Sequence, residues 1–144
     1  KYCELRQACS LPVGCGDETT RTMDSMKLLE SNAVDIIRLD ASTMGGIAAV
    51  RNVYARAKAM EIPVSFHEHP EIHEHLVFGL GCSDHVEIFP LDRPFDKVHE
   101  LWESTLFQRI QNGYLHPSQT PGIGIRLKPD MVDKFAVRTG KVEL

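Results

Sequence analysis

The sequence lacks the features that mark several large classes of protein. Its 144 residues carry a net charge of -4 with a pI near 6.0, so there is no basic surplus to attract nucleic acid or an anionic membrane. Its longest apolar runs fall far short of a membrane span, and its first residues do not have the layout of a signal peptide. We therefore expect a cytoplasmic protein that binds neither nucleic acid nor a membrane.

The cysteines form no recognisable framework either. The chain has four of them, Cys3, Cys9, Cys15 and Cys82, and no two are spaced as Cys-x-x-Cys. This pattern favours reduced thiols over disulfides, in agreement with the expected location.

What the sequence does contain is four short strand-like runs, each with a chemically capable side chain at its end or within it. The runs cover residues 12–16, 34–39, 62–66 and 85–89. Asp17, Asp40 and His67 directly follow the first three runs, and Glu87 lies inside the fourth. A parallel barrel collects its reactive groups in this way, at the carboxyl ends of its strands.

Helical patterns alternate with these runs. Apolar residues recur at helical spacing within 20–31 and 46–60, Pro70 fits the first turn of a helix over about 70–80, and residues 1–10 are typical of the end of a further helix. The runs begin at residues 12, 34, 62 and 85, which gives intervals of 22, 28 and 23 residues. That spacing is typical of strand–helix units, so the sequence predicts an α/β fold with a parallel sheet.

The length limits how much of a barrel the chain can form. A complete (β/α)8 barrel needs roughly 250 residues, and this chain has room for about four strand–helix units. We predict half a barrel over residues 1–110, ending in a helix at 94–110, and an irregular C-terminal extension over 111–144 that packs back on it. Because a half barrel has open sheet edges, we also expect the chain to form homo-oligomers.

Four segments resemble those of a known family. Asp-Ala-Ser-Thr-Met-Gly-Gly at 40–46 resembles the sixth-strand motif of the mandelate racemase branch of the enolase superfamily, in the mandelate racemase/muconate lactonizing enzyme family. Residues 63–76, which contain His67, are similar to its seventh-strand segment, and Glu87 has the spacing of its eighth-strand Glu. Residues 12–18 resemble its fifth-strand segment, and the tail is similar to C-terminal segments of acid-sugar dehydratases.

The resemblance implies that the chain is the C-terminal half of a TIM barrel and that its site removes a proton α to a carboxylate. His67 would be the base, and Asp40 would hydrogen-bond the far ring nitrogen of His67 and fix its tautomer. Glu87 would hydrogen-bond the substrate carboxylate as charge develops there, a role that protonation of Glu87 would favour.

The same chemistry requires a divalent metal to stabilise the charge on the carboxylate, and the resemblance implies Mg²⁺. Asp17 is the expected ligand, with Glu18 beside it as the alternative, because this chain has Gly-Asp-Glu where branch members often have Gly-Glu. The other two ligands and a catalytic lysine belong to preceding strands of the family that this sequence does not contain. We therefore expect the 144-residue chain alone to be inactive.

The histidines and carboxylates also have plainer explanations. Asp17 and Glu18 could begin a helix, Asp40 could cap a loop, and Glu87 could face solvent. Three further histidines near His67, namely His69, His73 and His75, suggest a zinc site, but Pro70 and interleaved glutamates favour loop and helix-start roles for these three.

The leading functional hypothesis is part of a Mg²⁺-dependent lyase that dehydrates a sugar acid. One alternative is a racemase or epimerase of a 2-hydroxy or amino acid derivative, whose second base would come from outside this chain. The other alternative is a non-catalytic half barrel that has lost the metal site. The expected partners are a small carboxylate substrate and further copies of the chain.

Overall fold

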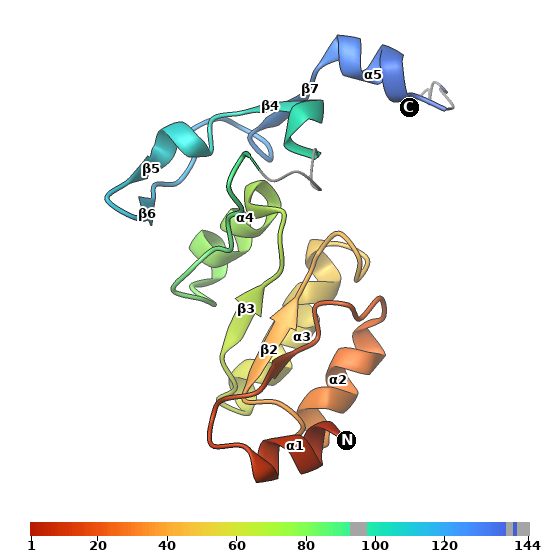
Figure 1. The fold of residues 1–144 in the computed structure, drawn as a ribbon, viewed down its shortest axis with the longest axis vertical. Helices are drawn as coiled ribbons and strands as arrows, with labels where there is room; N and C mark the ends of the chain where they lie inside the picture. Colours follow the sequence, from red (N-terminus) through yellow and green to blue (C-terminus); the bar gives the residue numbers. More distant parts are fainter. Residues whose placement is uncertain (93–97, 138–139, 141–144) are drawn as a thin grey trace. The chain divides into compact units, whose positions relative to one another are not determined.

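The computed structural model describes residues 1–92, 98–137 and 140, which fall into two compact units, Lys1–Ile88 and Phe89–Leu144. The first unit alternates strands with helices (Figure 1). Its elements are α1 (Tyr2–Ala8), β1 (Gly14–Cys15), α2 (Thr22–Glu30), β2 (Ile36–Leu39), α3 (Ile47–Ala59), β3 (Val64–Phe66) and α4 (Pro70–Leu80). The strands are parallel in the order β1-β2-β3, with Gly14 opposite Ile36 and Ile37 opposite Val64. This confirms the predicted α/β fold class of a half barrel.

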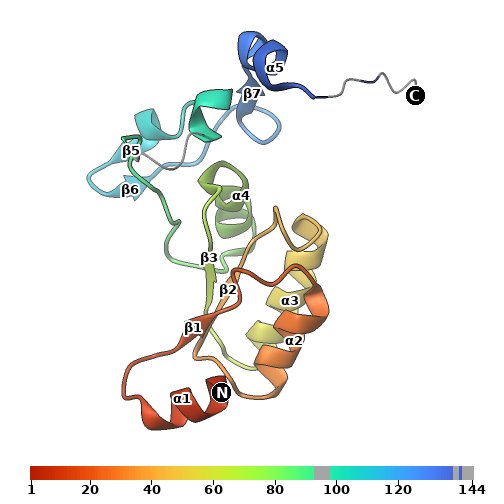
Figure 2. The ribbon, with the colours of Figure 1, turned by 45° about the vertical axis from the view of Figure 1, so that its right-hand side comes forward.

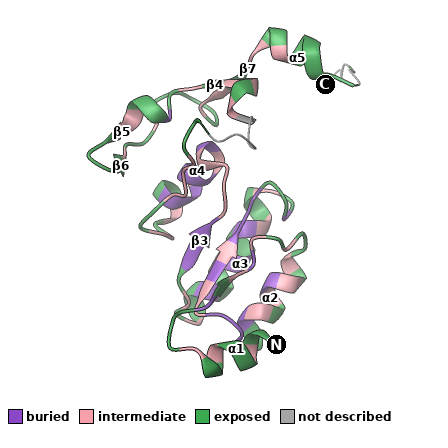
Figure 3. Cartoon of the chain, in the orientation of Figure 1, coloured by how far each residue is buried: buried purple, intermediate pink, exposed green. Residues whose placement is uncertain are grey.

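The core of this unit lies between the sheet and the helices. Helices α2 and α3 lie side by side next to the sheet in both views (Figures 1 and 2). On β2 the side chains alternate between two faces, so Ile37 and Leu39 are fully buried while Arg38 between them points to the other face. Burial is concentrated on β3 and on the inner faces of α3 and α4 (Figure 3). Each fully buried aliphatic side chain contributes roughly 1.5–3 kcal/mol.

Gly16 allows the end of β1 to lie directly against β2. Its φ is +126°, and a Cβ added there would lie 2.5 Å from the Arg38 carbonyl oxygen. Any other residue would need a strained backbone and a displaced strand. The glycine therefore determines how closely Asp17, the next residue, approaches β2.

The predicted fourth strand over 85–89 is wrong, since the structure shows no regular element at these described residues. The reason lies at the end of β3. The Glu68 N–H donates a hydrogen bond to the side-chain oxygen Oε2 of Glu87 at 2.8 Å, and not to the backbone of a neighbouring strand. The segment therefore delivers Glu87 to the strand ends without pairing there.

The second unit differs from the prediction over residues 98–110. Instead of a helix, these residues form the 3-10 turn η1 (Val98–Leu101), strand β4 (Trp102–Ser104) and the 3-10 turn η2 (Phe107–Arg109); residues 93–97 lie outside the described part of the chain. Strand β4 pairs antiparallel with β7 (Ile125–Leu127), a non-local contact that overrides the local apolar spacing.

The predicted irregular tail is more regular than expected. Strands β5 (Ile110–Gln111) and β6 (Tyr114–Leu115) form a hairpin around Asn112 and Gly113, which both have positive φ, as a tight two-residue turn requires. Helix α5 (Pro129–Phe135) follows β7. The predicted domain boundary after residue 110 and the packing of the tail stay predictions. Among the described residues no helix is both long and apolar enough to cross a membrane.

A candidate active site at the carboxyl ends of the strands

Four ionisable side chains meet at the carboxyl ends of the parallel strands. Asp17 follows β1, Arg38 lies on β2, His67 follows β3, and Glu87 comes from the segment after α4. Arg38 lies between the others: its Nη2 is 3.0 Å from Glu87 Oε1 and 3.2 Å from His67 Nδ1. Its Nε donates to Asp17 Oδ2 at 3.4 Å. The structure thus brings together three of the residues predicted from the sequence, Asp17, His67 and Glu87.

Arg38 itself was not among the predicted site residues. The signal that could have found it is a charged side chain inside an otherwise apolar strand, two residues before Asp40. Since neighbouring strand residues face opposite sides, the burial of Ile37 and Leu39 against the helices directs Arg38 to the side where a barrel has its interior. A guanidinium placed there needs acidic partners, and Asp17 and Glu87 supply them.

Glu87 is the carboxylate that lies closest to the His67 ring. Its Oε2 is 3.2 Å from His67 Nδ1 and accepts the Glu68 N–H at 2.8 Å. Burial raises the pKa of the Glu87 carboxyl, but that N–H and the Arg38 guanidinium lower it by more, so its pKa lies below its usual range. Glu87 is therefore ionised at neutral pH. The surroundings favour this ionised form over the protonated one that would suit a hydrogen bond to a substrate carboxylate, and that role of Glu87 stays a prediction.

Asp40 has partners other than the predicted one. Within the described residues there is no hydrogen bond between Asp40 and His67. Asp40 Oδ1 instead accepts the Ser42 N–H at 2.8 Å and lies 3.5 Å from Nε2 of His73. Burial raises the pKa of Asp40, and contacts with the His73 ring and the Ser42 N–H outweigh burial and lower it to about 2. Asp40 is a buried anion at the end of β2, held next to a histidine on α4.

Asp17 and Glu18 after β1 offer the type of ligand that Mg²⁺ binds, but too few ligands to complete its coordination shell. Asp17 and the exposed Glu18 border a hollow of about 400 Å³ that Gly16 and Cys15 also line, and carboxylate oxygens are ligands that Mg²⁺ prefers. Across residues 1–92, 98–137 and 140, no three His, Cys, Asp or Glu side chains are grouped to hold a metal. Asp17 can therefore supply one ligand, and a full coordination shell needs groups beyond those that the described residues bring together here.

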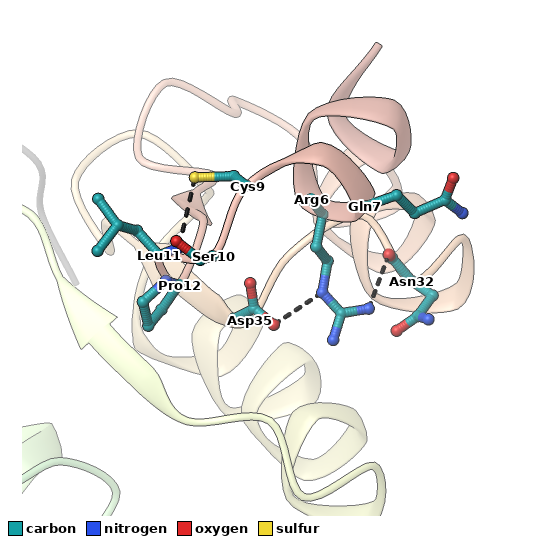
Figure 4. Close-up of a pocket in the computed structure, with 8 residues that line it drawn as sticks. All are labelled: Arg6, Gln7, Cys9, Ser10, Leu11, Pro12, Asn32 and Asp35. Atoms are coloured by element: carbon teal, nitrogen blue, oxygen red, sulfur yellow. Dashed lines mark hydrogen bonds and ion pairs between the residues drawn. The ribbon is translucent and has the colours of Figure 1, made fainter.

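A second hollow, of about 330 Å³, lies between α1 and the start of β1 (Figure 4). Its two charged side chains, Arg6 and Asp35, already bind each other. Arg6 Nε donates to Asp35 Oδ1 at 2.7 Å, and Asp35 Oδ2 accepts the Val13 N–H at 2.8 Å. The hydrogen bond from the Val13 N–H lowers the pKa of Asp35 most, and the Arg6 guanidinium lowers it further. These contacts tie α1 to the sheet, and we interpret the hollow as structural.

Comparisons with known proteins agree with the parallel α/β fold. The family model described as "Enolase C-terminal domain-like" matches residues 1–131. The chain is 24% identical over 139 residues to a D-galactonate dehydratase family member of Catenulispora acidiphila, covering 92% of this chain and 31% of that protein. It is 28% identical over 139 residues to the D-xylonate dehydratase of Haloferax volcanii, covering 92% of this chain and 32% of that protein.

A solved structure is similar over the same region. The mandelate racemase/muconate lactonizing enzyme from a marine actinobacterium, in complex with magnesium, superposes with a TM-score of 0.76 at 27% identity. The match covers 92% of this chain and 37% of that one. The chain spans about a third of the length of the curated relatives it matches.

Proposed function

Because the chain belongs to the enolase C-terminal domain-like family of the enolase superfamily, we propose that it is part of an enzyme that removes the α-proton of a sugar acid and so dehydrates it. The observation that carries the proposal is the contact of His67 with Glu87 and Arg38 at the strand ends. The named dehydratases among the relatives support a sugar acid as the substrate class.

In this proposal His67 is the base and Glu87 orients it. This role requires the tautomer with the proton on Nδ1, which donates to Glu87 Oε2 at 3.2 Å and leaves Nε2 the lone pair that accepts the α-proton. Because a guanidinium can only donate, Arg38 Nη2 then bonds to Glu87 Oε1 and not to Nδ1. Arg38 keeps Glu87 ionised, so Glu87 can accept this hydrogen bond. The role assigned to Asp40 from the sequence thereby passes to Glu87, and Asp40 supports the loop after β2.

The proposed dehydration needs no reagent other than the substrate. The α-proton moves to His67 Nε2, the bond between the β-carbon and its hydroxyl breaks, and His67 returns the proton to the leaving hydroxyl to form water. Mg²⁺, held by Asp17 together with ligands from outside this chain, would stabilise the negative charge that develops on the substrate carboxylate. The magnesium in a structural neighbour supports this assignment.

The test is a screen of sugar acids with Mg²⁺, run on the full-length protein. We expect one acid to yield its dehydrated 2-keto acid. The His67→Asn variant should lose about 10²- to 10⁴-fold in kcat, the usual contribution of a general base. His116→Asn, which alters an exposed histidine in the second unit, is the control and should keep full activity.

Two other outcomes would redirect the proposal. Exchange or inversion of the α-hydrogen without loss of water would identify a racemase or epimerase, whose second base comes from elsewhere in the protein. Turnover that survives in His67→Asn would show that His67 is not the base. The 144-residue chain tested alone is expected to be inactive, because it supplies an incomplete set of metal ligands.

A further inference from the structure

His73 on α4 is a completely buried histidine whose ring bridges the loops after β2 and β3. Its side chain is 0% exposed. Its Nδ1 lies 2.7 Å from the Glu68 carbonyl oxygen, and its Nε2 lies 3.0 Å from the Ala41 backbone nitrogen. Glu68 directly follows His67, and Ala41 directly follows Asp40. Each contact is therefore one residue away from a side chain of the candidate site.

These two contacts determine where the ring proton lies. A backbone N–H can only donate, so Nε2 must accept the hydrogen bond from Ala41. The neutral ring then carries its proton on Nδ1, which donates to the Glu68 carbonyl. The ring also stacks on Phe66, the last residue of β3, with centroids 4.8 Å apart and planes 21° apart. With both edges and one face in contact, His73 has one favourable orientation.

The loop after His67 needs such contacts because its backbone is strained. Glu68 and His69 have φ values of 48° and 41°, in the left-handed region that side chains with a Cβ disfavour. Two side chains hold the backbone of Glu68: Glu87 accepts its N–H and His73 donates to its carbonyl. The position of His67 therefore depends on His73 as well as on Glu87.

We infer that His73 is a positioning residue that clamps together the loops carrying Asp40 and His67, and that it does so as a neutral imidazole with its proton on Nδ1. The importance of this clamp for turnover rests on the proposed function, but the clamp itself does not. His73 has no contact with His67 Nε2 or with the hollow beside Asp17, so it acts through the two backbone groups.

The test uses two variants that each keep one half of the clamp. Asn places an amide N–H near the position of Nδ1, and Gln places a carbonyl oxygen near the position of Nε2. In His73→Asn, we expect the Ala41 amide to exchange with solvent about tenfold faster, the loss of one hydrogen bond, while the His67 and Glu68 amide shifts stay in place. In His73→Gln, we expect the Ala41 amide to keep its slow exchange, while the His67 and Glu68 amide shifts change because the donor to the Glu68 carbonyl is lost. His116→Asn is the matched control and should change neither loop.

A measurement on the unaltered chain covers the case in which the variants fold poorly. The ¹⁵N shifts of the His73 ring should show a protonated Nδ1 and a bare Nε2. A proton on Nε2 would overturn the inference, as would unchanged exchange of the Ala41 amide in a folded His73→Asn variant. A simple packing role predicts equal effects of Asn and Gln on both loops.

Kinetics separate this inference from the proposed function. In the active protein, His73→Gln, which releases the loop that carries His67, should lower kcat at least about tenfold with little change in KM, because the buried His73 touches no substrate, and His73→Asn should lower kcat less. Full activity in both variants, alongside an inactive His67→Asn, would remove the positioning role and leave the proposed function standing. The ring tautomer and the amide exchange are measured without substrate, so their outcome does not depend on the proposed function.

Discussion

At the scale of single residues, Asp17 and Glu87 can lie close together as anions because the Arg38 guanidinium stands between them. Removing this cation should favour the neutral form of Glu87. We predict that Arg38→Met raises the pKa of Glu87, as measured by the ¹³C shift of its carboxyl across a pH titration. Arg51→Met, which alters an exposed arginine on α3, should leave that titration unchanged. An unshifted Glu87 in Arg38→Met would contradict the arrangement.

Asp40 makes a prediction about stability and pH. Its pKa in the folded chain is lowered, to about 2, so its ionised form stabilises the fold above its ordinary pKa and this contribution is lost as the pH falls towards 2. The full shift corresponds to about 2 kcal/mol. This is an upper value, since a His73 ring that accepts from Ala41 cannot also donate to Asp40.

Urea unfolding at pH 7 and pH 3 measures this contribution. Asp40→Asn should lower the free energy of unfolding by up to about 2 kcal/mol at pH 7, and by less at pH 3, where the wild-type carboxyl has begun to lose its advantage. The difference between the two proteins removes the contributions of other carboxyls. An equal loss at both pH values would show that the ionised form is not what stabilises the loop.

The sequence could predict that Asp17, His67 and Glu87 meet, because the carboxyl ends of parallel strands share one edge of a sheet. It could not predict that Asp40 lies next to His73 and not next to His67. That choice depends on the turn after β3, where Glu68 and His69 take left-handed conformations that residue type does not signal. Arg38 is a similar case, because its role follows from which face of β2 is buried.

At the scale of elements, Gly16 is the position where the strand ends are most tightly constrained. We predict that Gly16→Ala destabilises the chain by about 1–3 kcal/mol, because its backbone is left-handed and the new Cβ would meet the Arg38 carbonyl. Gly79→Ala is the matched control, since it lies in α4 with nothing within 4 Å of its added Cβ. It should be neutral or stabilise by up to about 1 kcal/mol. Equal effects of the two substitutions in thermal unfolding would contradict the close approach of β1 and β2.

Elements held by local patterns were predictable, and those held by distant partners were not. Helices α2 and α3 follow from apolar residues at helical spacing, α4 from Pro70 at its first turn, and β2 from a nearly continuous apolar run. The predicted helix over 94–110 failed because Trp102–Ser104 pairs with Ile125–Leu127, more than twenty residues along the chain. The segment predicted as a fourth strand instead meets the turn after β3 through a side chain, since Glu87 accepts the Glu68 N–H.

At the scale of the whole molecule, the described parallel sheet ends in β1 on one side and β3 on the other. Unpaired strand edges are prone to pair with another chain. We predict that the 144-residue chain self-associates at micromolar concentration, as measured by light scattering after size exclusion. A single species at 16.2 kDa would contradict this.

The central claim is that His67 removes the α-proton of a carboxylate substrate. The most direct test is the rate at which an α-deuterated sugar acid, taken from the screen, loses its deuterium with Mg²⁺ present. We expect loss with the wild-type protein and with His116→Asn, and a rate at least about 100-fold lower with His67→Asn. Equal rates of deuterium loss with and without His67 would contradict the account.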